Sequence, residues 1–143
     1  MGFAGRLLGV AGLLPFVATS LGLWLRDDDR FLQVGVLYGA VILSFMGGVQ
    51  WGFALHGRDS EGAVGRLLWS VVPSLMAWAA VLAEDPLVAT LGLAGGLFLT
   101  WLYEQRPLLR RSLPDWYRGL RHLLTAVAVL CMLANGFWVA LRW

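Results

Sequence analysis

The sequence has 143 residues, of which 59% are hydrophobic and only 14% are charged, and its formal net charge is +2. Soluble domains carry roughly a quarter charged residues, so this composition excludes an ordinary water-soluble globular protein. With a mean hydropathy of +0.70, the chain is expected to contain apolar runs of about 18 to 25 residues, the length that a helix needs to cross a bilayer.

Apolar runs of this length occur five times, and the predicted spans are residues 7–25, 31–56, 64–83, 86–103 and 120–141. The runs are continuous and lack the two-residue alternation of a lipid-facing strand, which favours helices over a barrel. The predicted fold class is therefore all-α: a polytopic membrane protein with a single domain, residues 1–143, folded as a compact bundle of five transmembrane helices. The first span is expected to be retained, because "FVATSLG" offers no small-x-small cleavage site.

The basic residues are all arginine, and their distribution between the loops predicts the orientation. If the spans alternate, one side of the membrane holds eight of the 11: Arg6, Arg58, Arg66, Arg106, Arg110, Arg111, Arg118 and Arg121. The other side holds three: Arg26, Arg30 and Arg142. Because cytoplasmic loops are enriched in basic residues, the amino terminus is predicted to be cytoplasmic and the carboxyl terminus outside, with the matrix replacing the cytoplasm in a mitochondrion.

Prolines mark local features of the predicted helices. Pro15 and Pro73 lie well inside their spans, where each removes a backbone donor and should bend the helix. Pro86 follows Asp85, a pairing typical of a helix start with an N-cap and proline at the first helical position.

The second span carries small residues at a four-residue spacing within "YGAVILSFMGGVQWG". The predicted helix-packing interface comprises Ala40, Ser44, Gly47, Gly48 and Gly52. In lipid, helices associate by close packing rather than by the hydrophobic effect, and small residues allow that approach. Gly35 and Gly39 form a second small pair on another face, so this helix is expected to be central.

We expect the cores of the predicted spans to contain no Asp, Glu or Arg, and their polar residues suit hydrogen bonds between helices. No hydrolase, zinc-protease or phosphate-loop motif occurs, so we expect a protein that is not an enzyme and that holds no metal or cofactor. The single cysteine, Cys131, excludes an intrachain disulfide and a zinc motif. His56 and His122 could bracket a haem iron, but an interfacial position for both is the preferred interpretation.

One end of the predicted bundle gathers aromatic, basic and amide side chains. The candidate ligand or partner site comprises Gln50, Trp51, His56, Trp116, Tyr117, Arg118, Arg121 and His122. Within "SLPDWYRGLRHLLT", Pro114 and Asp115 predict a helix start. The residues that follow are expected to lie at the level of the lipid headgroups before the fifth span begins.

Four motifs, "GLLPF", "YGAVILSFMGGVQWG", "PSLMAW" and "LPDWYRGLRHLLT", together resemble the family of unknown function, domain of unknown function 3429, that includes transmembrane protein 69. The resemblance covers nearly the whole chain and implies a small multi-pass protein of the bacterial inner (cytoplasmic) membrane or of mitochondria. It implies no activity and no catalytic residues. Five spans and abundant tryptophan are also similar in architecture to the translocator proteins that bind tetrapyrroles and sterols, without matching motifs.

Two functions remain open. The first is a non-enzymatic accessory or assembly subunit that packs against a larger membrane complex, respiratory or photosynthetic. The second is a binding or carrier protein for a lipophilic ligand such as a quinone, a haem or other tetrapyrrole, or a sterol. The expected partners are membrane lipids, other integral membrane proteins and this small molecule, and not nucleic acid, because no soluble basic domain is present. A channel is disfavoured because the predicted spans carry no continuous line of polar residues that could form a pore.

Overall fold

The computed structural model describes residues 2–56, 62–106, 111 and 113–142, which form helices and no strands. Five helical segments are long and apolar enough to cross a membrane: Gly2–Arg26, Asp29–His56, Ala63–Leu82, Pro86–Glu104 and Asp115–Arg142. The predicted all-α fold with five membrane spans is therefore confirmed. The orientation stays a prediction, and two of the arginines on which it rests, Arg58 and Arg110, lie outside the described residues.

Proline interrupts two of the spans where the sequence predicts a bend. The first span divides into α1 (Gly2–Ala11) and α2 (Leu14–Arg26), and Pro15 lies in the first turn of α2. The third divides into α4 (Ala63–Trp69) and α5 (Val72–Leu82), with Pro73 in the first turn of α5. Proline lacks the N–H that would continue the helical ladder, so the regular helix stops just before it.

The other three spans are single helices: α3 (Asp29–His56), α6 (Pro86–Glu104) and α8 (Asp115–Arg142). As predicted, Asp85 caps α6, where its Oδ1 accepts a 2.8 Å hydrogen bond from the Leu87 amide. Helix α8 begins at the predicted residue but continues without a break into the span. The residues after Asp115 therefore form the first turns of the same helix as the fifth span, and their expected position at the level of the lipid headgroups stays a prediction.

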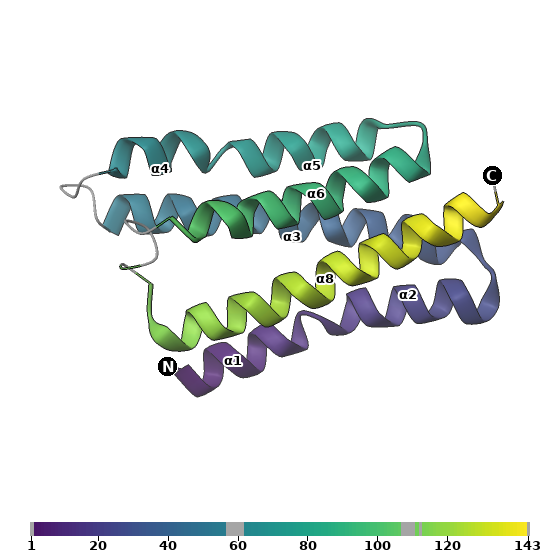
Figure 1. Ribbon diagram of the computed structural model, residues 1–143, viewed down its shortest axis with the longest axis horizontal. Coiled ribbons are helices and arrows are strands. Elements are labelled where there is room, and N and C mark those ends of the chain that lie inside the picture. The colour runs from purple at the N-terminus through teal and green to yellow at the C-terminus, as the bar shows by residue number, and fades with distance from the viewer. Residues whose placement is uncertain (1, 57–61, 107–110, 112, 143) are drawn as a thin grey trace.

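The helices run side by side along the long axis of the molecule (Figure 1). Helix α8 packs against α1, α2 and α6, while α3 packs against α2, α5, α6 and α8. The predicted central position of the second span is thus confirmed. The amino terminus, the end of α6 and the start of α8 lie at one end, called here the amino-terminal end of the bundle; the carboxyl terminus lies at the other (Figure 1).

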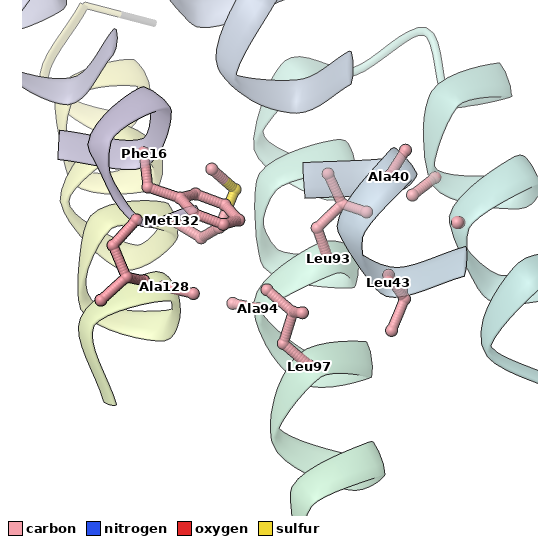
Figure 2. Close-up of a cluster of buried hydrophobic side chains, with 11 residues drawn as sticks. Phe16, Ala40, Leu43, Leu93, Ala94, Leu97, Ala128 and Met132 are labelled. Carbon is pink, nitrogen blue, oxygen red and sulfur yellow. The ribbon is translucent and has the colours of Figure 1, made fainter. Parts of the chain in front are cut away.

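The core is apolar, but so is the outside. Figure 2 shows the central cluster, to which α2, α3, α6 and α8 contribute Phe16, Ala40, Leu43, Leu93, Ala94, Leu97, Ala128 and Met132. Large apolar side chains such as Phe3 and Leu25 are also exposed, at 82% and 80%. Several polar residues, in contrast, are fully buried, among them Thr90 and Asn135. This distribution suits a chain whose solvent is hydrocarbon, where polar groups must find partners inside the protein.

The predicted packing ridge on α3 is only partly correct. Ala40 and Gly47 are buried and Ser44 is half-buried, but Gly48 and Gly52 are exposed, and a Cβ added at either would meet no atom within 4 Å. The buried small residues instead follow the second face that begins with the Gly35 and Gly39 pair. The physical reason is helical geometry: the buried residues Leu32, Gly35, Gly39, Leu43, Met46 and Gln50 recur every three or four positions and so stay on one side. Steps of strictly four residues advance by about 40° each, so Gly48 and Gly52 leave the face that Ala40 borders.

Candidate functional site

Glu104, the last residue of α6, is buried at the amino-terminal end of the bundle, where its exposed fraction is 1%. It continues the inward face of α6, which carries one buried residue every three or four positions: Thr90, Leu93, Leu97, Thr100 and Glu104. Helical periodicity therefore directs this carboxylate into the bundle rather than towards the connector that follows.

Two helices supply the partners of the Glu104 carboxylate. Gln50 of α3 donates a hydrogen bond from Nε2 to Oε1 over 2.7 Å, and the Tyr117 hydroxyl of α8 donates to the same oxygen over 3.3 Å. Arg121 of α8 donates from Nε to Oε2 over 3.0 Å. Both carboxylate oxygens are thus engaged by donors, and the ion pair compensates the buried charge.

Arg121 itself is 4% exposed and uses two of its three guanidinium nitrogens within the bundle. Besides the bond to Glu104, its Nη1 donates to Thr125 Oγ1 over 2.7 Å. Its Nη2 is buried and has no hydrogen-bond partner among the described residues. Buried polar groups are almost always hydrogen-bonded, so this guanidinium nitrogen is an exception to the general pattern.

A cavity of about 190 Å³ lies beside this arginine. Its polar lining residues are Arg121 and Thr125, and the others are glycine or apolar: Leu8, Gly9, Gly12, Leu13, Phe16, Ile42, Phe45, Met46, Leu97, Leu124 and Ala128. Leu8 and Phe45 on its rim are 72% and 61% exposed. The cavity therefore opens sideways, towards the face that the acyl chains of a bilayer would cover.

The interruption between α1 and α2 forms part of the cavity wall. Gly12 and Leu13 lie in this interruption and line the cavity. The Gly12 carbonyl, which lies outside the regular helices, accepts a 2.6 Å hydrogen bond from the Tyr38 hydroxyl of α3. Gly9 packs on Leu120, since an added Cβ would lie 2.8 Å from Leu120 Cδ2. The two contacts hold α1 against α8 and fix the broken segment to α3.

The structure brings together three of the eight predicted site residues. Gln50, Tyr117 and Arg121 all bind Glu104. Trp51 and His56 are exposed on α3 and contribute to neither the network nor the cavity.

The other three predicted residues have separate contacts. Trp116 packs against α1, where a Cβ added at Gly5 would lie 2.6 Å from its ring. Arg118 forms an ion pair with Asp115. His122 is exposed and accepts a 2.9 Å hydrogen bond at Nδ1 from Trp101 Nε1.

Sequence analysis missed Glu104 and with it the buried charge. The predicted fourth span ends at Tyr103, where the apolar run ends, yet α6 includes Glu104. The expectation concerned only the cores of the spans, and it did not foresee that charged residues near the span ends are buried: Glu104, Arg121 and also Arg66, which is 8% exposed in α4. The sequence does contain a pattern that indicates Glu104: Leu93, Leu97 and Thr100 are spaced by three or four residues, and one further helical turn reaches Glu104.

Comparisons with known proteins agree with this architecture. The family described as "Protein of unknown function (DUF3429)" matches residues 3–137. The chain is 37% identical over 134 residues to transmembrane protein 69 of Xenopus tropicalis, a match that covers 90% of this chain and 51% of the relative. It is 32% identical over 129 residues to transmembrane protein 69 of Mus musculus, covering 85% of this chain and 50% of the relative.

The chain thus spans about half the length of the curated relatives that it matches. No solved structure gives a significant match. Because the family match extends over almost all of the membrane bundle and both relatives exceed 30% identity, this chain belongs to the transmembrane protein 69-like (DUF3429) family of multi-pass membrane proteins.

Proposed function

We propose that this protein binds a lipophilic molecule inside its membrane bundle, in the cavity beside Arg121. One observation carries the proposal: Arg121 and Thr125 are the two polar side chains in the lining of an otherwise apolar cavity of about 190 Å³. Ligand sites are typically apolar with a few polar groups that fix orientation, and the lining follows that pattern. No covalent chemistry is assigned to the site, so the proposed role is binding or carriage rather than catalysis.

The buried network supports this proposal by making the arginine rigid. Glu104 and Thr125 hold two of its nitrogens, so the side chain keeps one position in the cavity lining. A preorganised site loses little conformational entropy when a ligand arrives. The sideways opening near Leu8 and Phe45 provides a route from the bilayer.

The test is to purify the protein from native membranes in mild detergent and to identify the organic-soluble molecules that remain bound. A stoichiometric small molecule is expected. Ala128→Leu should abolish its retention, because Ala128 lines the cavity and the larger side chain would occupy it. Ala126→Leu is the matched control, since Ala126 is exposed on the opposite side of the same helix. Equal retention by both variants, or none by the wild-type protein, would contradict the proposal.

A second function, accessory subunit of a larger membrane complex, is favoured by a different observation. Gly48 and Gly52 form an exposed pair of small residues on α3 with open space beside them. Glycines at this spacing allow a helix of another protein to approach closely. Under this proposal the partner is an integral membrane protein, of a respiratory or photosynthetic complex.

The accessory role is tested by native gel electrophoresis of mildly solubilised membranes. Gly48→Leu together with Gly52→Leu should release the protein from a high-mass assembly to the free form. Gly95→Leu is the control, because Gly95 is an exposed glycine of α6 with equally open space. If wild-type protein migrates alone under every growth condition, this role is wrong.

We also propose the bacterial inner membrane as the location, with the amino terminus in the cytoplasm and with lipids rather than nucleic acid in contact with the chain. The support is the concentration of arginine in the loops at one end of the bundle. Cysteine accessibility from each side of intact membranes, with single cysteines at each terminus, measures the orientation directly. Labelling of the carboxyl-terminal cysteine from the cytoplasmic side would contradict it.

A further inference from the structure

We propose that a groove between α1 and α8 holds one anionic phospholipid, with the lipid phosphate on the Arg6 guanidinium and the start of an acyl chain on the apolar residues below it. The groove has a volume of about 270 Å³ and lies at the amino-terminal end of the bundle, where the two helices pack side by side (Figure 1). It is separate from the cavity beside Arg121, so this inference goes beyond the proposed function. The evidence is the shape of the groove, the order of its lining residues and its charge.

The groove forms because two glycines lie at the contact between α1 and α8. Gly5 brings α1 close to α8, since an added Cβ would lie 2.6 Å from the Trp116 ring. Gly119 of α8 has the opposite surroundings: it is exposed, and a Cβ added there would meet no atom within 4 Å. The missing side chain at Gly119 leaves open space beside the contact, and this space is part of the groove.

The groove and the cavity of the proposed function lie on opposite sides of α1. Gly9 faces α8, where an added Cβ would meet Leu120. Each helical residue is rotated by about 100° from the one before it, so Arg6 and Val10 lie on one flank of this face and Leu8 lies on the other. Arg6 and Val10 line the groove, whereas Leu8 lines the cavity. A ligand in the groove therefore does not occupy the cavity.

The lining of the groove changes from polar to apolar along the spans, in the same order as a phospholipid. Arg6 and Trp116 lie within about 6 Å of the residues at which their spans begin, at a rise of about 1.5 Å per residue. Val10 and Leu123 lie about 12 Å from the same ends. Tryptophan and arginine side chains are typical of the level of the lipid headgroups. The groove therefore offers one molecule both a contact at headgroup level and a contact at the level of the acyl chains.

The charge of the groove favours an anionic headgroup. Arg6 is exposed and forms no ion pair with any residue that the structure describes, so its guanidinium is accessible to a ligand. Asp115 also lines the groove, but Arg118 forms an ion pair with it and compensates its charge. The lining therefore carries one uncompensated positive charge. Arginine binds phosphate through paired hydrogen bonds, and basic pockets between membrane helices bind anionic lipid headgroups.

The test is native mass spectrometry of the full chain, delipidated in mild detergent and titrated with dioleoyl phosphatidylglycerol or dioleoyl phosphatidylcholine. We expect one phosphatidylglycerol per chain, bound about fivefold more tightly than phosphatidylcholine, the ratio expected for one arginine near an anionic headgroup. Inorganic phosphate at the same concentration should not displace the lipid, because it makes no contact with the apolar part of the groove. Displacement would show that the site takes free phosphate and would overturn the proposal.

Two substitutions separate the phosphate contact from the acyl contact. Arg6→Gln should lower the affinity for phosphatidylglycerol about fivefold, to that for phosphatidylcholine. Its control is Arg26→Gln, which removes an exposed arginine at the other end of the same span and should have no effect. Gly119→Leu should abolish binding of both lipids, because the new side chain fills the open space, whereas the control Gly95→Leu, at an equally open position of α6, should not. Circular dichroism and thermal unfolding verify that each variant is folded.

The outcomes distinguish this inference from the proposed function. Ala128→Leu fills the other cavity and should leave phosphatidylglycerol binding unchanged. If Ala128→Leu abolishes lipid binding and Gly119→Leu does not, the lipid occupies that cavity and the groove is not its site. Equal affinities for the two lipids, or an unchanged affinity in Arg6→Gln, would overturn the anionic class. Failure of the chain to bind either lipid overturns this inference and leaves the proposed function intact.

Discussion

The two halves of the bundle hold their helices together by different means. At the amino-terminal end, α3, α6 and α8 meet through the ion pair of Glu104 and Arg121 and the amide of Gln50. In the carboxy-terminal half, the buried contacts are made through glycine and through neutral hydrogen bonds, and the ion pair of Arg142 with Asp27 is partly exposed. A Cβ added at Gly35 would lie 3.2 Å from Thr19 Oγ1 and 3.3 Å from Asn135 Nδ2. The charged side chain of Arg121 lines a cavity, whereas Gly35 allows close contact between helices.

The difference shows how a membrane protein builds a site without a soluble domain. Small residues let the backbones of neighbouring helices approach each other closely. A buried ion pair needs its hydrogen bonds in fixed directions, and a cavity lined by Arg121 and Thr125 remains beside it. Four substitutions sharpen this comparison.

The largest effect is expected from Arg121→Met, which removes the counter-ion of Glu104. A buried carboxylate without its partner should reduce the free energy of unfolding by about 3 to 5 kcal/mol. Denaturant titration in detergent micelles measures the loss. The double variant Glu104→Met with Arg121→Met should lose clearly less than the single variant, since no charge is left unpaired. A double variant as unstable as the sum of both single variants would show that the pair is not coupled.

Gly35→Leu should break the close contact in the other half. The new side chain would collide with Thr19 of α2 and Asn135 of α8, and overpacking of this kind costs about 1 to 3 kcal/mol. The same unfolding assay applies. Gly48→Leu on the exposed face of α3 is the matched control and should show no such loss, because nothing lies within 4 Å of its Cβ position. Equal losses at Gly35 and Gly48 would contradict the assignment of the buried face.

Ser20→Ala should have a smaller effect in the carboxy-terminal half. The Ser20 hydroxyl donates a 2.8 Å hydrogen bond to Asn135 Oδ1 between α2 and α8. Hydrogen bonds between membrane helices contribute roughly 0.6 kcal/mol on average, because alternative partners exist within the unfolded helices. Thermal unfolding would detect the shift, with the exposed Ser74→Ala as its control. A loss as large as that of Arg121→Met would remove the distinction between the two halves.

The smallest effect is expected from Trp101→Phe at the amino-terminal end. This change removes the hydrogen bond to His122, which lies on an exposed part of the surface. Surface substitutions of this kind change the free energy of unfolding by about 0.5 kcal/mol or less. A large loss in the unfolding assay would mean that the aromatic and imidazole side chains, rather than the buried network, hold this end together.

The candidate site could be predicted from the sequence only in part. Gln50, Tyr117 and Arg121 are recognisable as polar residues near the ends of apolar runs, and the structure gathers them on one carboxylate. Trp51 and His56 also lie near the end of an apolar run, but their side chains are on the exposed face of α3. Depth along a helix can be counted from the sequence, whereas the direction of a side chain depends on the rotation of that helix about its axis.

The sequence by itself determined the number of spans, their positions and their interruptions, because apolar length, proline and the Asp85 cap act within a few residues of where they occur. The tertiary structure alone decided which small residues of α3 are buried, which acid pairs with Arg121, and that a cavity remains beside it. The physical reason is that both faces of a membrane helix are apolar, so hydrophobicity does not mark the inner side. Only the packing of neighbouring helices distinguishes Gly47 from Gly48, and only α6, α3 and α8 together surround Glu104 with donors.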